Sequence, residues 1–189
     1  MSEIVIVAGV TRSGTSLMMQ MLEAGGIAPA AGSFPSYELE SIGAVTPEIY
    51  QSAGGKAIKL VDTQHQMPPR DLPLCVILMR RNLAEQAKSV AKWIRATLNM
   101  RISSLDLHLG IERDIRQIET SLRRYPHCRV LSVSFDALIR CPTTQARHIA
   151  RFVGVPMDVD RMVRQVRPRS AACLPGLLEA QLIEEALTP

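Results

Sequence analysis

The segment from Gly9 to Ser16 constrains the fold more than any other part of this chain. It reads Gly-Val-Thr-Arg-Ser-Gly-Thr-Ser, follows the apolar run Ile4–Val7 and precedes the helix-forming stretch Leu17–Glu23. A strand, a glycine-framed turn and a helix together form a cradle in which backbone N–H groups and the helix N-terminus point at one anion. The segment therefore predicts a phosphate-binding loop at the end of a first strand.

The loop departs at one position from the nucleotide-hydrolase pattern G-x-x-x-x-G-K-[ST]. Thr15 stands where that pattern has its lysine, and the positive charge has moved to Arg12, inside the loop. The lysine of the pattern reaches the β- and γ-phosphates of a nucleoside triphosphate. The replacement favours a phosphate-rich donor over the usual hydrolysis of ATP or GTP.

Alternating strand and helix patterns predict an α/β fold. Four nearly continuous apolar runs suit parallel strands that are covered on both faces. These strand candidates are Glu3–Ala8, Ala57–Val61, Leu74–Met79 and Arg129–Val133. We expect a single domain over residues 1–189, with a P-loop-type three-layer α/β/α arrangement. Its sheet should be mainly parallel, with about 4–5 strands.

Composition and charge limit the class of protein. The chain has 189 residues, 47% of them hydrophobic and 21% charged, which suits one globular domain with a buried core. Aromatic residues make up only 4%, so no set of stacking side chains is available for single-stranded nucleic acid, and we expect no nucleic-acid partner. The net charge of +4 rests on 18 Arg against 4 Lys, and guanidinium forks match phosphate and sulfate oxygens.

Sequence patterns for membrane insertion, secretion and metal binding are not seen. No stretch approaches the length of apolar residues that a membrane span needs, and the first apolar run lacks the basic region of a secretory signal. We therefore expect no membrane span and a cytoplasmic location. The cysteines form no C-x-x-C pair and no histidine stands at zinc-ligand spacing, so no metal site is predicted.

A second segment, Pro73–Val90, contains another candidate anion site. An apolar strand ends in Arg80 and Arg81, Asn82 suits the N-cap of the next helix, and Ser89 follows Arg81 by eight residues. Ligands of doubly wound folds bind at the carboxyl edge of the sheet. Arg81 and Ser89 are therefore predicted to hold a second phosphate, some distance from the loop.

Together the two segments resemble the cofactor signatures of the sulfotransferase family. Arg12–Ser16 is similar to the family's [K/R]-S-G-T-[T/S] loop, and Arg81–Leu83 with Ser89 is similar to its R-[N/D]-P strand end and helical serine, except that Leu83 replaces the proline. The resemblance implies transfer of a sulfuryl group from 3′-phosphoadenosine 5′-phosphosulfate (PAPS) to a hydroxyl or amine, with adenosine 3′,5′-bisphosphate (PAP) as product. It extends over residues 3–26 and 74–100, and more loosely over residues 129–156.

The resemblance also implies roles for individual residues. The 5′-phosphosulfate would be held by Arg12, Ser13, Gly14, Thr15 and Ser16, and the 3′-phosphate by Arg81 and Ser89. Arg12 would also stabilise the charge that develops as the sulfuryl group leaves. In relatives a basic C-terminal segment folds over the donor, which here points to Arg167 and Arg169.

The base that removes the acceptor proton has several candidates. They are Glu38, Glu40, Asp62 and His65. Some bacterial family members place a glutamate after the first helix, which points to Glu38 or Glu40. Lys59 lies where a strand delivers its side chain toward the sheet edge, so it can assist the leaving sulfate or be an edge-strand charge. The lysine–histidine pair typical of cytosolic members is absent here in its usual form.

Three functions are compatible with these patterns. The first is a metal-independent PAPS sulfotransferase that acts on a small-molecule acceptor. The second is a P-loop kinase or nucleotide hydrolase, since Ala57–Asp62 loosely imitates a strand that ends in a metal-binding acid. The third is a non-catalytic phosphoadenosine-binding protein that keeps only the donor site. The two signatures favour the first.

Overall fold

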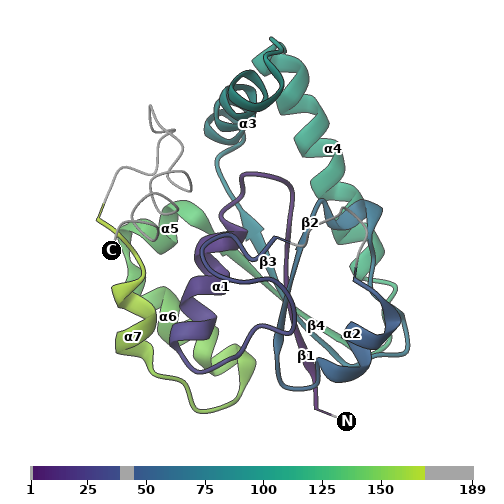
Figure 1. The fold of residues 1–189 in the computed structure, drawn as a ribbon, viewed down its shortest axis with the longest axis vertical. Helices are drawn as coiled ribbons and strands as arrows, with labels where there is room; N and C mark the ends of the chain where they lie inside the picture. Colours follow the sequence, from purple (N-terminus) through teal and green to yellow (C-terminus); the bar gives the residue numbers. More distant parts are fainter. Residues whose placement is uncertain (1, 39–44, 169–189) are drawn as a thin grey trace.

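The computed structural model describes residues 2–38 and 45–168, and a parallel sheet lies at their centre (Figure 1). The sheet's four strands are β1 (Ile4–Gly9), β2 (Ala57–Val61), β3 (Leu74–Arg80) and β4 (Cys128–Ser134). Their order is β2-β1-β3-β4, and every neighbouring pair is parallel. All four strands therefore end at the same edge, and the two segments singled out in the sequence follow the two central strands.

Helices cover both faces of the sheet. Core contacts place α1, α5, α6 and α7 on one face and α2, α3 and α4 on the other. The helices are α1 (Thr15–Ala24), α2 (Pro47–Ser52), α3 (Leu83–Leu98), α4 (Ser104–Leu122), α5 (Phe135–Arg140), α6 (Pro142–Val153) and α7 (Val159–Arg164). A single 3₁₀ turn, η1 (Thr63–His65), follows β2. The prediction of an α/β/α arrangement with a mainly parallel sheet is confirmed.

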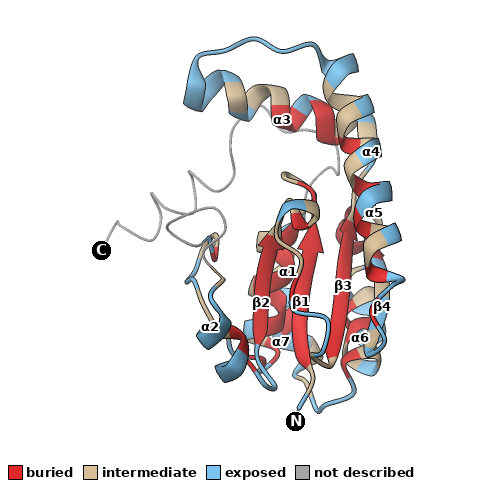
Figure 2. Ribbon diagram, turned by 90° about the vertical axis from the view of Figure 1, so that its right-hand side faces the viewer, coloured by how far each residue is buried: buried red, intermediate tan, exposed pale blue. Residues whose placement is uncertain are grey.

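The burial of the strands follows from their position in the sheet. Every residue of β1 is buried, with Val5 and Val7 in the core under α1 and Ile4, Ile6 and Ala8 in the core under α3 and α4 (Figure 2). Strand β4 differs from the expectation of coverage on both faces. It forms one edge of the sheet; its Val133 packs in the core with α5 and α6, whereas Val130, on the other face, is 44% exposed.

Local signals in the sequence explain where the helices begin and end. The Asn82 side chain accepts a hydrogen bond from the backbone N–H of Glu85 at 3.2 Å, which confirms Asn82 as the N-cap of α3. Helix α6 begins at Pro142 and ends before Gly154, whose φ of 81° closes the helix in the left-handed conformation. The region 25–55, rich in Gly, Pro, Ala and Ser, contains α2.

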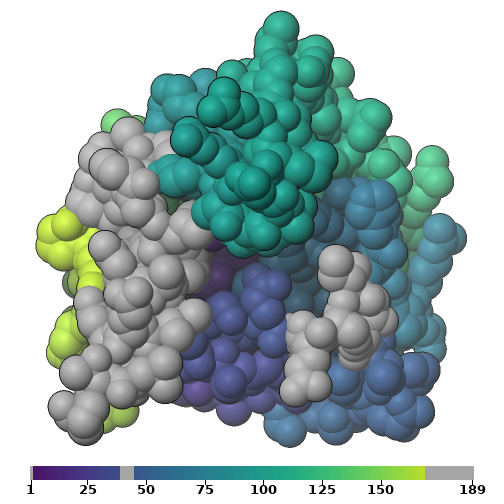
Figure 3. Space-filling view, turned by 45° about the horizontal axis from the view of Figure 1, so that its top comes forward, coloured from purple at the N-terminus to yellow at the C-terminus, as the bar shows by residue number. Residues whose placement is uncertain are grey.

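Helices α3 and α4 form a hairpin that projects beyond the sheet (Figures 1 and 3). An apolar stripe of α4 is buried against the sheet and consists of Ile111, Ile115, Ile118 and Leu122. The hairpin begins at the end of β3, so the start of α3 lies beside the loop that follows β1. None of the helices within residues 2–38 and 45–168 is long and apolar enough to cross a membrane.

Candidate active site

The loop after β1 is a compact turn built from two left-handed residues. Arg12 has a φ of 64° and Gly14 a φ of 103°. A Cβ on Gly14 would lie 2.6 Å from a ring carbon of Phe135, so both the backbone conformation and the space demand glycine here. The turn closes through the backbone N–H of Ser13, which donates to the carbonyl of Val10 at 3.2 Å. The predicted strand–turn–helix cradle is therefore present.

The hydroxyl residues of the loop do not cap α1. Its N-cap is Gly14, and no side chain makes a capping hydrogen bond to this helix. Ser13 is only 1% exposed, and its hydroxyl has no hydrogen-bond partner among the described residues. A buried hydroxyl without a partner costs free energy, so its presence is typical of a site that completes its hydrogen bonds with a ligand.

The two signature segments meet at Arg12. Its Nε donates to the Ser89 hydroxyl of α3 at 3.2 Å, and its backbone carbonyl accepts a hydrogen bond from Arg81 Nη1 at 3.3 Å. The Arg81 guanidinium also lies over the ring of Phe135, 4.7 Å from its centroid. The side chains of Arg12 and Arg81, one from each signature segment, are therefore both held at this loop.

Gln86 of α3 hydrogen bonds to the same loop, and the sequence patterns did not predict this residue as part of the site. This side chain is fully buried, and its Nε2 donates to the carbonyls of Thr11 at 2.8 Å and Val10 at 3.4 Å. Gln86 stands three residues before Ser89, so the two share a face of the helix. One indication of this contact was present in the sequence: Gln86 stands beside the apolar stripe of α3, on the face of the helix that packs against the core.

The corner after β2 holds the other side of the loop. The Asp62 carboxylate accepts a hydrogen bond from the backbone N–H of Thr11 at 2.9 Å, and the Thr63 hydroxyl accepts one from Gly9 at 3.2 Å. Desolvation raises the pKa of Asp62; the hydrogen bond from Thr11 opposes this shift without cancelling it. Asp62 itself adopts a left-handed conformation, with a φ of 52°. The corner therefore presents a partly buried carboxyl beside the anion loop.

Lys59 is buried and hydrogen-bonded to three groups, rather than solvated at the edge of the sheet. Its residue is 6% exposed although β2 is an edge strand. The ammonium group donates to the Ser16 hydroxyl at 3.0 Å, to the Ser36 carbonyl at 2.6 Å and to the Glu38 carboxylate at 2.8 Å. The side chain of Glu38 is 64% exposed. Lys59 thus connects β2, the first turn of α1 and the segment after α1.

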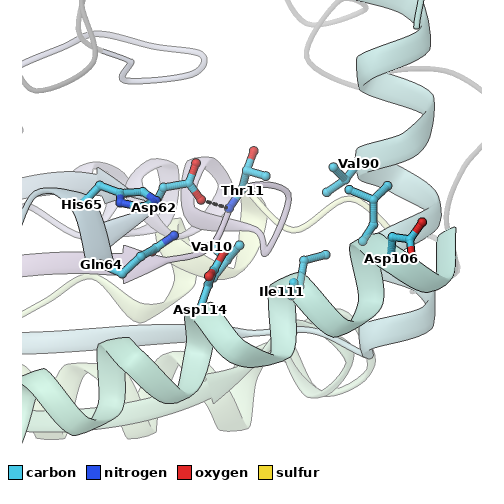
Figure 4. A pocket seen from close by; sticks show the side chains of 11 residues that line it. Val10, Thr11, Asp62, Gln64, His65, Val90, Asp106, Ile111 and Asp114 are labelled. Carbon is cyan, nitrogen blue, oxygen red and sulfur yellow. Dashed lines mark hydrogen bonds between the residues drawn. The ribbon is translucent and has the colours of Figure 1, made fainter. Parts of the chain in front are cut away.

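A pocket of about 230 Å³ opens beside the loop, between η1 and the α3–α4 hairpin (Figure 4). On the loop side it is lined by Thr11, Asp62 and His65, and on the hairpin side by Val90 and Ile111. The side chains of Asp62 and His65 come from the corner after β2 and lie on the same side of this pocket (Figure 4). Two of the four base candidates therefore share one pocket with the anion loop.

The remaining predicted residues lie elsewhere. Glu40 and Arg169 fall outside the described residues, and Arg167 is exposed near the end of the described chain. Arg80, beside Arg81, forms an ion pair with Glu119 of α4. In the described part of the chain no group of three or more His, Cys, Asp and Glu residues has the arrangement of a metal site.

Residues 73–159 match the family model described as "Sulfotransferase family". Over this segment, which is less than half of the chain, the sequence is similar to sulfotransferases. It contains the second signature with Arg81 and Ser89, the α3–α4 hairpin and β4, whereas the Arg12 loop precedes it. The family match therefore agrees with the resemblance at the second signature.

Solved sulfotransferase structures share the fold. The crystal structure of mouse sulfotransferase SULT7A1 complexed with PAP aligns with a TM-score of 0.58 and 18% identity, over 88% of this chain and 63% of that one. Retinol dehydratase in complex with androsterone and inactive cofactor PAP aligns with a TM-score of 0.52 and 16% identity, over 86% of this chain and 62% of that one. The chain thus spans less than two thirds of both neighbours. No curated protein gives a significant sequence match.

Proposed function

We propose that this chain transfers a sulfuryl group from PAPS to a hydroxyl or amine of a small-molecule acceptor, without a metal. The observation that carries the proposal is the meeting of the two signature segments at Arg12. Ser89 and Arg81, from positions 77 and 69 residues away along the chain, both hydrogen bond to this one loop residue. A donor with phosphoryl groups at both ends of its ribose needs two anion sites, and both segments follow strands that end at the edge of the sheet where ligands of doubly wound folds bind.

The residues of the loop fit the 5′-phosphosulfate of the donor. The left-handed turn at Arg12 and Gly14 leaves backbone N–H groups and the N-terminus of α1 as donors, and the Ser13 hydroxyl has an unused hydrogen bond. Arg12 would neutralise the charge that grows on the bridging oxygen, and its contact with Ser89 holds the guanidinium in place beforehand. Arg81 and Ser89 would bind the 3′-phosphate.

Asp62 and His65 are the base candidates that the pocket supports. Both line it together with Thr11 of the anion loop. A carboxyl whose pKa burial has raised is a stronger base than an exposed one, which suits removal of the acceptor proton. Glu38 is engaged instead by the ammonium of Lys59, whose contact with Ser16 places a cation beside the first turn of α1.

The contacts of Asp62 weigh against the kinase alternative. A metal-binding acid at the end of a strand must turn its oxygens toward the phosphates and the cation. One Asp62 oxygen is already used by the backbone N–H of Thr11, and Thr15 replaces the phosphate-binding lysine. The Asp62–Thr11 contact and the missing lysine together weigh against a magnesium-dependent kinase.

Calorimetry with PAP and with ATP separates the proposed functions. We expect PAP to bind in preference to ATP and to keep its affinity when magnesium is removed; magnesium-dependent binding of ATP would instead support a kinase. Turnover of PAPS with a panel of phenols, alcohols and amines then tests catalysis. Tight PAP binding without any sulfated product would leave a phosphoadenosine-binding protein.

Arg81→Ala tests the second anion site. A charge-assisted hydrogen bond to phosphate contributes about 1.5–3 kcal/mol, so PAP should bind roughly 10- to 100-fold more weakly. The control ligand is adenosine 5′-phosphate, which lacks the 3′-phosphate. It should lose little affinity, and only through the contact between Arg81 and the Arg12 carbonyl. An equal loss for both nucleotides would remove Arg81 from the 3′-phosphate site.

A further inference from the structure

The turn between α3 and α4 exposes large apolar side chains at the far end of the hairpin. We define the hairpin tip as residues 98–109. Its exposed side chains are Leu98 (58%), Met100 (54%), Ile102 (38%), Leu105 (66%) and Leu109 (57%). In the described part of the chain, nine large apolar side chains are exposed, and five of them lie in this short segment. Apolar surface residues are normally scattered singly, so their concentration at one place indicates a contact surface.

The tip is a capped turn whose exposed side chains face away from the core. Asn99 ends α3 in the left-handed conformation, and the Ser103 hydroxyl accepts a hydrogen bond from the N–H of Leu105 at the start of α4. Leu105 and Leu109 are four residues apart, so they share one face of α4. The core stripe that begins at Ile111 uses another face of the same helix.

On the α3 side of the tip the charged residues are all positive, whereas α4 contributes Asp106 to the tip itself. Residues 86–105 contain Lys88, Lys92, Arg95 and Arg101 and no aspartate or glutamate. Lys88 pairs with Glu85, while Arg95 and Arg101 lie close to the tip and are both exposed. Lysine and arginine next to exposed apolar residues complement a surface that is apolar inside and anionic at its rim.

The shape of the tip distinguishes between kinds of partner. The hairpin projects at one end of the long axis of the molecule (Figure 1), and its tip is convex in the space-filling view (Figure 3). A standard protein–protein interface takes on the order of 800 Å² of surface from each partner. Shallow insertion between lipid headgroups needs only a few apolar side chains with cations around them.

We propose that the hairpin tip docks this protein onto anionic lipid membranes. Leu105, Leu109 and the side chains of the turn enter the headgroup region, and Arg95 and Arg101 contact lipid phosphates. Asp106 and Leu107 of the tip line the pocket that Thr11 also lines, so the tip adjoins the anion loop. The docked protein would hold its anion loop near the membrane surface without any spanning segment.

Vesicle co-sedimentation tests the proposal directly. The wild-type chain should bind vesicles that contain 30% phosphatidylglycerol in phosphatidylcholine, and should bind pure phosphatidylcholine vesicles at least tenfold more weakly. Leu105→Ser with Leu109→Ser should lower binding to the anionic vesicles at least tenfold. Arg95→Gln with Arg101→Gln should lower it by about fivefold for each charge at low salt.

The controls use apolar residues that are exposed elsewhere. Val130→Ser with Val155→Ser removes the same kind of side chain from β4 and from the turn after α6, and should leave vesicle binding unchanged. Thermal unfolding shows whether each variant is folded. Trp93, the only tryptophan, lies five residues before Leu98, so a blue shift of its emission with anionic vesicles gives a second readout.

Three outcomes would overturn the proposal. They are equal binding to neutral and anionic vesicles, absence of binding to both, and a self-association in ultracentrifugation that the Leu105 and Leu109 substitutions abolish. The last would assign the tip to a second copy of this chain. Because none of these measurements uses PAPS, the membrane proposal and the proposed sulfotransfer can fail separately.

Discussion

Gln86→Met tests whether α3 holds the anion loop in the shape that binds the donor. The substitution keeps the length of this fully buried side chain and removes its two N–H groups. The carbonyl of Val10 keeps the N–H of Ser13 as a donor, whereas the carbonyl of Thr11 loses the 2.8 Å hydrogen bond from Gln86. The perturbation therefore acts mainly at Thr11, the residue before Arg12.

The expected size follows from these contacts. Loss of one good hydrogen bond to a partly buried carbonyl costs about 1–3 kcal/mol. The Gln86 Oε1 has no partner among the described residues, so its removal returns part of that cost. A net change of about 1–2 kcal/mol in favour of other loop conformations corresponds to a 5- to 30-fold weaker apparent affinity for the donor. Once the donor is bound the loop is restored, so kcat should fall much less than the KM for PAPS rises.

Calorimetry with PAP and steady-state kinetics with PAPS measure the two quantities. The matched control is Gln51→Met, an exposed glutamine of α2, which should leave PAP affinity unchanged. If Gln86→Met lowers the melting temperature but leaves PAP affinity within twofold of the wild type, Gln86 is merely a packed core residue. That result would refute the role we assign to it.

Three further predictions concern the loop and its corner. Arg12→Ala should lower kcat about 100-fold or more and PAPS affinity much less, because its charge acts mainly as the bridging bond breaks; a loss of affinity alone would contradict this role, and Arg12→Lys should recover part of the rate. Burial raises the pKa of Asp62, so the folded protein keeps this proton to a higher pH than the unfolded chain. The resulting stabilisation is complete below the ordinary pKa of 3.8 and is lost as the pH rises through the raised value; urea unfolding between pH 3 and 7 should show this pH dependence in the wild type and not in Asp62→Asn. Gly14→Ala should cost at least about 1–2 kcal/mol in urea unfolding, since the loop needs a φ of 103°, whereas Gly110→Ala in α4, with open space around it, should stabilise by about 0.5–1 kcal/mol.

The parts of the fold that the sequence predicted best are those set by local patterns. Strand β2 has the predicted bounds, β3 is one residue longer at its end, and β1 and β4 differ from the prediction by one residue at both ends. The start of α6 at Pro142 and its end before Gly154 were predictable because proline and glycine act within a single turn of chain. The exposure of β4 was not, because it depends on which strand the sheet places at its edge.

The sequence predicted which residues belong to the site better than it predicted the contacts between them. Arg81 and Ser89 were grouped as one phosphate site, yet the Ser89 hydroxyl accepts its hydrogen bond from Arg12. The sequence pattern allowed Lys59 to be an edge-strand charge or an assisting cation. The folded chain is needed to show its buried contacts with Ser16 and Glu38. Such pairs join residues more than 20 positions apart, and no periodicity in one sequence encodes them.

The hydrogen bonds of Asp62 and Gln86 to opposite groups of Thr11 have an evolutionary consequence. The Thr11 N–H donates to Asp62, which follows β2, and the Thr11 carbonyl accepts from Gln86 of α3. The two backbone groups of one residue therefore depend on two distant side chains. A descendant that replaces either partner must supply a substitute group or reshape the turn. Drift at positions 62 and 86 should therefore be correlated, with each tolerating change mainly when the other changes too.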